Sequence, residues 1–340
     1  MTQLTPLALT MGDPAGIGPD IALMAWVQRR EHKLPPFVVY GDIPVLEDRA
    51  KALGLAVPLQ WFASPGAAND AFDSVLPVIA IPACCTVVPG QPSRGNAAAT
   101  IASIDLATAA VIAGHARAVV TNPIAKSVLY AAGFRHPGHT EYLAHLAHTA
   151  TGRRVVPVKM LACDELKVVP ATVHIPLAAV PAALTHDHLT RTIEITAEGL
   201  RRDFGIADPR IAVAGLNPHA GESGTIGTED RDLIAPVIGG VQRRGLRVTG
   251  PHSADTLFHA AARRTYDAVV AMYHDQALIP IKTLAFDLGV NVTLGLPFVR
   301  TSPDHGTAFD IAGTGKASPT SLIEALKMAD RMARARAAAA

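Results

Sequence analysis

The segment 7-LALTMGDPAGIGPD-20 shows the pattern of the whole chain, because an apolar run is followed by a glycine-rich turn and then by a helix. Leu7–Met11 is short and apolar, which is typical of a buried strand. Gly12–Pro19 suits a tight turn, and Pro19 is favourable in the first turn of a helix expected over Asp20–Arg30. A strand–turn–helix unit of this kind predicts an α/β fold with a parallel sheet.

The same alternation continues toward the C-terminus. Further strands are expected at Phe37–Tyr40, Val75–Ile81, Ala118–Thr121, Lys167–His174, Arg210–Leu216, Ala268–Tyr273 and Val290–Leu296. Further helices are expected at Val45–Leu53, Ala97–Ala116, Ala125–Ala132, Thr140–Thr149, Leu189–Phe204, Glu229–Arg244 and Ser321–Ala335, the last ending in a frayed, alanine-rich tail. The alternation predicts a mainly parallel sheet with helices on both faces, and no repeat of fixed period is present.

Composition narrows the class of protein. The 340 residues are 49% hydrophobic and 17% charged, which excludes a disordered chain and allows one large α/β body or two domains. With 30 basic and 29 acidic residues the net charge is +1, so no global basic field exists to hold nucleic acid or an acidic membrane.

Cysteine usage and the N-terminus predict the compartment. Cys84, Cys85 and Cys163 are odd in number and two are adjacent, which argues against a disulfide framework and for a reducing cytosol. The start of the chain lacks the pattern of a signal peptide, and we expect no apolar run long enough to cross a bilayer. The sequence therefore predicts a soluble, cytoplasmic protein.

Three histidines lie where strands are expected to end. His174, His219 and His274 each follow an apolar run, and ligands of parallel sheets bind at the carboxyl ends of the strands. Three imidazoles presented there would form an open metal site with positions left for substrate oxygens. The alternative is that each histidine only caps a strand or satisfies a buried carbonyl.

Two carboxylates accompany these histidines. Asp275 directly follows His274, and Asp255 comes just before an expected helix. Either carboxylate could orient a metal-bound histidine or polarise a metal-bound hydroxyl, while Asp255 could equally be a helix N-cap.

A second group of residues suits an anionic ligand. His139 and Thr140 open a helix in which Thr140 is expected as the N-cap, and Lys126 lies at the start of the preceding helix. Three further polar residues, Lys282, Asn291 and Arg300, would suit a doubly charged phosphate, unless the two cations are merely solvated.

Two glycine-rich stretches do not match nucleotide-binding motifs. Gly12–Asp20 is not the Rossmann fingerprint, and Gly313–Lys316 lacks the spacing of a P-loop. The first is expected either to contact a ligand or to form only a tight βα turn. Gly221–Asp230 is a third such loop, which either clamps a ligand or merely turns.

Six stretches taken together resemble the 4-hydroxythreonine-4-phosphate dehydrogenase family, over residues 7 to 328 and in the family's order. They are Gly12-Asp-Pro-Ala-Gly-Ile-Gly-Pro19, Thr121-Asn-Pro-Ile-Ala-Lys126, Pro137-Gly-His-Thr-Glu141, Gly215-Leu-Asn-Pro-His-Ala-Gly-Glu222, Ala271-Met-Tyr-His-Asp-Gln276 and Gly289-Val-Asn-Val-Thr-Leu-Gly-Leu-Pro297. The region between Leu53 and Gly95 and the alanine-rich tail match nothing in the family pattern.

The resemblance implies a two-domain α/β/α fold like that of isocitrate and isopropylmalate dehydrogenases. On this basis we expect a first domain of residues 1–138 plus 307–340 and a second of 139–306, which carries the metal histidines and the dimer interface. The active site would lie in the interdomain cleft of a homodimer and be shared between subunits. NAD or NADP would bind without a Rossmann motif, and no residue is assigned to the cofactor.

The resemblance also implies roles for individual residues. His174, His219 and His274 would bind one divalent ion (Zn, Co, Mg or Mn). The substrate contacts would be His139, Thr140, Lys282, Asn291 and Arg300. One of Lys282, Asp255 and Asp275 is expected to relay the proton.

The expected reaction is the oxidative decarboxylation of 4-phosphohydroxy-L-threonine to 3-amino-2-oxopropyl phosphate and CO2, in pyridoxal phosphate biosynthesis. The alternative within the family is a catabolic paralogue acting on 4-phospho-D-threonate or 4-phospho-D-erythronate. A relative that oxidises cis-dihydrodiols fits less well, because its substrate has no phosphate for Lys282 and Arg300. A metal-stabilised binding protein without redox activity is the alternative from another class.

Overall fold

A computed structural model describes residues 5–339, and the chain divides into two compact units. Unit 1 comprises the chain up to Pro157 together with Leu296–Arg334, and unit 2 comprises Val158–Gly295 together with the segment that starts at Ala335. These boundaries fall at other positions than the expected ones at 138/139 and 306/307. Helix α6 (His139–Thr151) and strand β12 (Arg300–Pro303) therefore belong to unit 1.

Neighbouring strands in the sheet of unit 1 run parallel to one another. Its strand order is β3 (Leu59–Trp61), β4 (Leu76–Ala80), β2 (Phe37–Gly41), β1 (Leu7–Thr10), β5 (Val119–Thr121) and β12. The chain builds outward from β1 through β2 on one side and then returns to place β5 on the other. The carboxyl ends of β1 and β5 therefore flank the point at which the strand order reverses, which is where ligands bind in open sheets.

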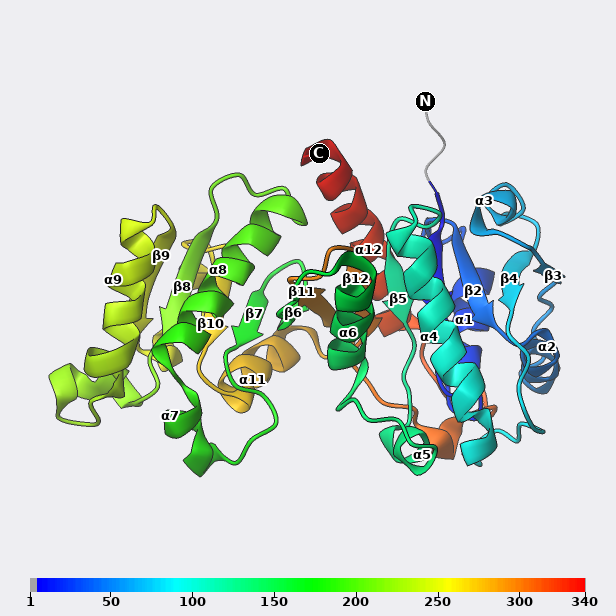
Figure 1. Cartoon of the computed structure of the whole chain (residues 1–340), viewed down its shortest axis with the longest axis horizontal. Helices are drawn as coiled ribbons and strands as arrows, with labels where there is room; N and C mark the ends of the chain where they lie inside the picture. The colour runs from blue at the N-terminus through cyan, green and yellow to red at the C-terminus, as the bar shows by residue number, and fades with distance from the viewer. Residues whose placement is uncertain (1–4, 340) are drawn as a thin grey trace. The chain divides into compact units, whose positions relative to one another are not determined.

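Helices cover both faces of this sheet (Figure 1). They are α1 (Gly18–Val27), α2 (Ile43–Ala52), α3 (Pro65–Ala68), α4 (Ala97–Ile112), α5 (Lys126–Ala131), α6 and α12 (Thr320–Ala339). Ala8 packs into one apolar cluster with Ala107 of α4. Its neighbours Leu7 and Leu9 point to the opposite face and are also fully buried, so neither face of β1 is open to water.

One helix of unit 1 is relevant to whether the chain could cross a membrane. The helical stretch Arg94–Ile112 is long and apolar enough to cross a membrane by length and composition, contrary to our expectation that no such run exists. It packs against β1 and β2, however, and 56% of its most apolar window is buried within the protein. Core helices of soluble proteins pass the same test, so the finding is weak support for a membrane span.

The sheet of unit 2 is mixed. Its strand order is β11 (Val290–Leu294), β6 (Val158–Ala162), β7 (Lys167–Pro170), β10 (Ala268–Ala271), β8 (Arg210–Ala214) and β9 (Arg247–His252). The four strands from β7 to β9 are parallel, whereas β6 runs antiparallel to both of its neighbours. The expected mainly parallel sheet is confirmed, with β6 as the exception that the sequence pattern did not reveal.

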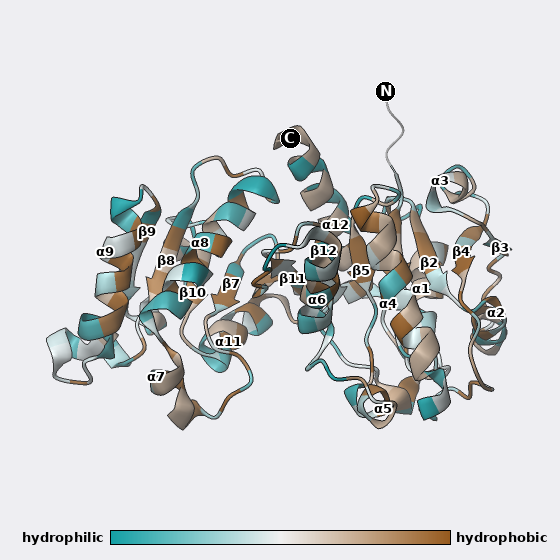
Figure 2. Ribbon diagram, viewed as in Figure 1, coloured by the Kyte–Doolittle hydropathy of each residue, from teal (hydrophilic) through white to brown (hydrophobic). Residues whose placement is uncertain are grey.

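The helices of unit 2 pack on apolar strands, as in unit 1. They are α7 (Val180–Ala183), α8 (His186–Arg202), α9 (Ala235–Arg243), α10 (Ala260–Arg263) and α11 (His274–Ala285). Val168 and Val269 pack with Ala277 and Ile281 of α11, and the strands are the most apolar part of the unit (Figure 2). Helix α11 was not expected, because Pro280 lies inside it and proline normally ends a helical pattern.

The expected frayed tail is instead ordered helix. Helix α12 continues to Ala339. The Nε of Arg336 donates a hydrogen bond to the buried carboxylate of Asp203 at 2.8 Å, and its Nη2 forms an ion pair with the same carboxylate at 2.7 Å. The three cysteines form no disulfide, as expected, with Cys84 and Cys85 exposed and Cys163 buried.

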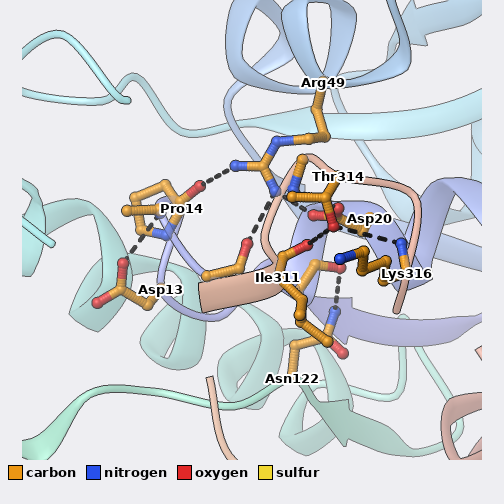
Figure 3. Close-up of polar contacts among 12 residues, drawn as sticks. Asp13, Pro14, Asp20, Arg49, Asn122, Ile311, Thr314 and Lys316 are labelled. Carbon is orange, nitrogen blue, oxygen red and sulfur yellow. Dashed lines mark hydrogen bonds and ion pairs between the residues drawn. The ribbon is translucent and has the colours of Figure 1, made fainter. Parts of the chain in front are cut away.

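The loop after β1 is held by a buried arginine (Figure 3). Arg49 is ion-paired with Asp20 and donates to the carbonyl oxygens of Gly16 and Pro14 at 2.8 and 3.1 Å. The loop also packs closely on its neighbours, because a side chain on Gly18 would collide with the carbonyl of Met11. These contacts support the tight-turn interpretation of Gly12–Pro19, and contact with a ligand stays a prediction.

Candidate functional site

The three histidines lie at the carboxyl ends of β7, β8 and β10, which are adjacent in the sheet of unit 2. His174 and His219 follow β7 and β8 in loops, and His274 is the first residue of α11. Because parallel neighbours end at the same edge, residues far apart in sequence are brought to one side of unit 2.

His174 and His274 are close neighbours. Their ring centroids lie 5.5 Å apart, and both rings line a cavity of about 320 Å³ together with Tyr273 and Asp275. The Nδ1 atom of His274 is 2.7 Å from the Asp275 carboxylate, which accepts a hydrogen bond from it. This contact directs Nδ1 to the carboxylate and leaves Nε2 for a ligand, which is compatible with the orienting role predicted for Asp275.

His219 occupies a second cavity, of about 360 Å³, which it lines with Asn217, Asp255, Gln276 and Tyr273. Tyr273 thus borders both cavities. The hydroxyl of Ser253 donates to Asp255 at 2.5 Å, and this bond and the nearby His219 lower the pKa of Asp255. The N-cap of the short helix at this point is Ser253 rather than Asp255, so the capping alternative for Asp255 is wrong.

The loop that carries His219 has an uncommon backbone. His219, Ala220, Gly221, Glu222 and Ser223 have φ angles between 44° and 79°, which makes a left-handed turn. Only glycine adopts this conformation freely, and each other residue costs on the order of 1–2 kcal/mol. Such strain persists only where the surrounding structure holds it in place, and it concentrates at functional sites.

The imidazoles of His174, His219 and His274 have the chemistry that a divalent ion requires, but only two of the three line the same cavity. Imidazoles suit Zn and Co, and the spacing of His174 and His274 is compatible with two ligands of one ion. His219 lies in the adjoining cavity, however, and within residues 5–339 no three His, Cys, Asp or Glu side chains form a group that could hold a metal. The three-histidine centre therefore stays a prediction.

A cationic cluster in unit 1 contains Arg300 and His139, two of the residues that were expected to bind the substrate. Arg300 is 5% exposed and donates to the hydroxyl of Thr121 from Nε and Nη2 at 3.2 and 2.6 Å. Burial lowers the pKa of Arg300 to about 10. The Nε2 atom of His139 is buried and has no hydrogen-bond partner among the residues that the structure describes. A buried cation beside an unsatisfied ring nitrogen is suited to receive an anion.

Electrostatics hold His139 neutral. Burial, then the charges of Arg300 and Lys126, lower its pKa well below the usual value of 6.5. The expected N-cap at Thr140 is wrong, because the helix begins at His139 and its N-cap is Gly138. Of the remaining predicted contacts, Lys282 lies on α11 with its Nζ 5.1 Å from the Phe286 ring centroid, and Asn291 lies on β11, both in unit 2.

The lowered pKa of His139 makes a prediction for stability. Below pH 6.5 the unfolded chain takes up a proton that the native state refuses, so the free energy of unfolding falls as the pH drops. For one histidine the slope is at most about 1.4 kcal/mol per pH unit. We expect His139→Gln to lose that part of the slope between pH 7 and pH 5, as measured by urea unfolding. His148→Gln, on the exposed side of the same helix, should keep the wild-type slope; equal slopes in all three proteins would contradict the prediction.

Three residues of the site were not anticipated as such. Gln276 accepts from the Met272 N–H at 2.7 Å and donates to the Gly215 carbonyl at 2.8 Å, so it joins the start of α11 to the His219 loop. Asp230 binds the same start of that loop, at Leu216, and Tyr273 lines both cavities. Tyr273 and Gln276 flank His274 and Asp275 within the family-like stretch Ala271–Gln276, and that position was the available signal for them.

The chain matches a known protein family over most of its length. Residues 33–329 match the family model described as pyridoxal phosphate biosynthetic protein PdxA. The chain is 56% identical over 339 residues to a 4-hydroxythreonine-4-phosphate dehydrogenase from Bradyrhizobium diazoefficiens, covering 97% of this chain and 98% of that protein.

Solved structures agree with the sequence matches. A 4-hydroxythreonine-4-phosphate dehydrogenase from Klebsiella pneumoniae superposes with a TM-score of 0.85 at 36% identity, covering 97% of this chain and 98% of that one. A terephthalate 1,2-cis-dihydrodiol dehydrogenase from Burkholderia xenovorans is similar at a TM-score of 0.66 and 30% identity, covering 97% and 98%. The expected α/β fold is confirmed by these neighbours.

Proposed function

Because this chain belongs to the family of the pyridoxal phosphate biosynthetic protein PdxA, we propose that it oxidises and decarboxylates 4-phosphohydroxy-L-threonine. It is an oxidoreductase of pyridoxal phosphate biosynthesis. The observation that carries the proposal is 56% identity over nearly the whole chain to a dehydrogenase of that substrate class. We further propose a homodimer in the cytoplasm.

The reaction balances with a nicotinamide as the only oxidant. The C3–H bond breaks and its hydride passes to NAD or NADP, while the C3 hydroxyl gives up its proton to a base. The resulting β-keto acid loses its carboxylate as CO2, and the electron pair left at C2 takes up a proton. The product is 3-amino-2-oxopropyl phosphate.

The protein's own residues supply binding and proton transfer. Arg300, His139 and Thr140 are proposed to hold the phosphate, which fixes the reacting carbon in place. Lys282 and Asn291 are proposed as further substrate contacts. The base is one of Lys282, Asp255 and Asp275.

A divalent ion is proposed at His174, His219 and His274, with Zn, Co, Mg and Mn as the candidates. When bound, such an ion polarises hydroxyl and carbonyl oxygens and stabilises developing negative charge. Asp275 is proposed to orient His274 for this purpose, in keeping with their 2.7 Å contact.

The test is turnover on alternative substrates. Reduction of NAD and NADP is followed by the absorbance of the reduced nicotinamide with 4-phosphohydroxy-L-threonine, with 4-phospho-D-erythronate and with a cis-dihydrodiol. We expect the first to be preferred and chelator to abolish turnover, with added zinc restoring it. Preference for the phosphorylated sugar acid would indicate the catabolic alternative. Turnover that survives saturating chelator would exclude the metal site, and no turnover on any substrate would favour a binding protein.

A further inference from the structure

We propose that Asp230 is a positioning residue whose carboxylate fixes the left-handed loop that carries His219. The inference rests on the proposed role of His219 in the catalytic site. Asp230 itself does not line either cavity, so it would act through the loop and not by touching substrate.

The carboxylate of Asp230 is buried and gathers the first residues of the loop. Asp230 is 1% exposed and opens a π-helical turn (Asp230–Ile234) that leads into α9. Its Oδ1 accepts from the backbone N–H of Leu216 at 2.8 Å. Its Oδ2 accepts from the backbone N–H and the side-chain amide of Asn217 at 3.1 and 2.9 Å. Three donors from two consecutive residues thus end on one carboxylate.

Those two residues immediately precede the strained turn. Pro218 follows Asn217, and the left-handed backbone begins at His219. The direction in which the chain enters the turn is therefore set at Leu216 and Asn217, where Asp230 binds it. Since a π-turn is an irregularity that is often found at functional sites, its position at Asp230 is in keeping with this role.

The C-terminal end of the loop, at Gly227 and Glu229, also contacts Asn217. The Asn217 amide also donates to Glu229 at 2.8 Å, and the Ile226 N–H donates to the Gly221 carbonyl at 3.1 Å. A side chain on Gly227 would lie within 2.5 Å of the Asn217 amide nitrogen. Both ends of the loop thus pack on the Asn217–Asp230 contact.

The N–H groups of Leu216 and Asn217 require a side chain at position 230 that accepts hydrogen bonds at both of its terminal atoms. Asparagine has nearly the same shape as aspartate, but one of its two terminal atoms donates and would face an N–H group. Asp230→Asn therefore removes the interaction with the least change in volume. Asp208→Asn is the matched control, because Asp208 is exposed and pairs with Arg247 near the amino ends of β8 and β9, whereas the loop follows the carboxyl end of β8.

The experiment measures loop order and zinc binding before turnover. We expect Asp230→Asn to raise amide hydrogen exchange in peptides covering residues 215–229 at least about 10-fold, with β8 and β10 unchanged. Zinc affinity, from competition with a chromophoric chelator, should fall about 10- to 100-fold, and kcat/KM should fall by a similar factor. Asp208→Asn should match the wild type in all three measurements.

The outcomes separate this proposal from the proposed function. A loosened loop with wild-type zinc affinity and turnover would overturn the positioning role, as would unchanged exchange in the loop. If Asp230→Asn does not fold, Asn217→Ala removes two of the side-chain hydrogen bonds and must show the same three changes in weaker form, or the proposal fails. If His219→Ala retains zinc binding and turnover, the proposed function of His219 fails, whatever Asp230 does to the loop.

Discussion

His219→Ala is expected to lower kcat/KM by on the order of 1000-fold or more while leaving a folded protein. Altering residues that only support a metal ligand costs 10- to 100-fold, and removal of a ligand itself should cost more. Zinc content per protomer, measured after dialysis against a trace of the metal, should fall with activity. His219 lies in an exposed loop segment of unit 2, so the fold does not depend on its ring.

The control for this variant is His259→Ala. His259 also belongs to unit 2, where its side chain caps a four-residue helix outside both cavities. We expect wild-type turnover and zinc content from it. A fully active His219→Ala protein would show that the third imidazole is no ligand, and that the pair His174 and His274 would have to suffice.

Most of the fold could be predicted from the sequence, because strands and helices differ in the spacing of their apolar residues. Leu7–Thr10, Phe37–Gly41 and Val119–Thr121 are fully buried parallel strands, and continuous apolar runs are typical of such strands. Of the strands that were not expected, β3, β9 and β12 lack this signal, whereas β6 is mostly buried and was missed all the same. β3 is short and largely exposed, and β12 begins with a charged residue, Arg300, whose burial no sequence pattern indicates.

The sequence predicted which residues belong to the candidate site but not how they are arranged. The position of each histidine after a strand was visible, because polar residues that end apolar runs mark the edge of a sheet. Strand β10 lies between β7 and β8 in the sheet, although it follows both of them in the sequence. Hydrophobic periodicity predicts where strands occur but not the order in which they pair. The left-handed turn at His219 was equally hidden, since four of its five residues are not glycine.

Arg300→Met is the second variant for which a large effect is expected. Loss of one partner of a desolvated charge pair costs about 2–5 kcal/mol, so kcat/KM should fall roughly 30- to several thousand-fold. The loss should appear mainly in KM, because the guanidinium is proposed to hold the unreactive phosphate end of the substrate. Inorganic phosphate should inhibit the wild type competitively and the variant far more weakly. A kcat/KM within 3-fold of the wild type would contradict the phosphate assignment.

Stability separates this role from a structural one. Burial opposes the charge of Arg300, as the lowering of its pKa shows, so the native state carries an energetic cost at this position. Methionine keeps an unbranched apolar stem without that cost, and replacing buried ionic groups by apolar ones is often neutral or stabilising. We therefore expect Arg300→Met to unfold at or above the wild-type temperature while losing substrate affinity. A purely structural arginine would show the opposite, because the variant would unfold at lower temperature and still bind the substrate once folded.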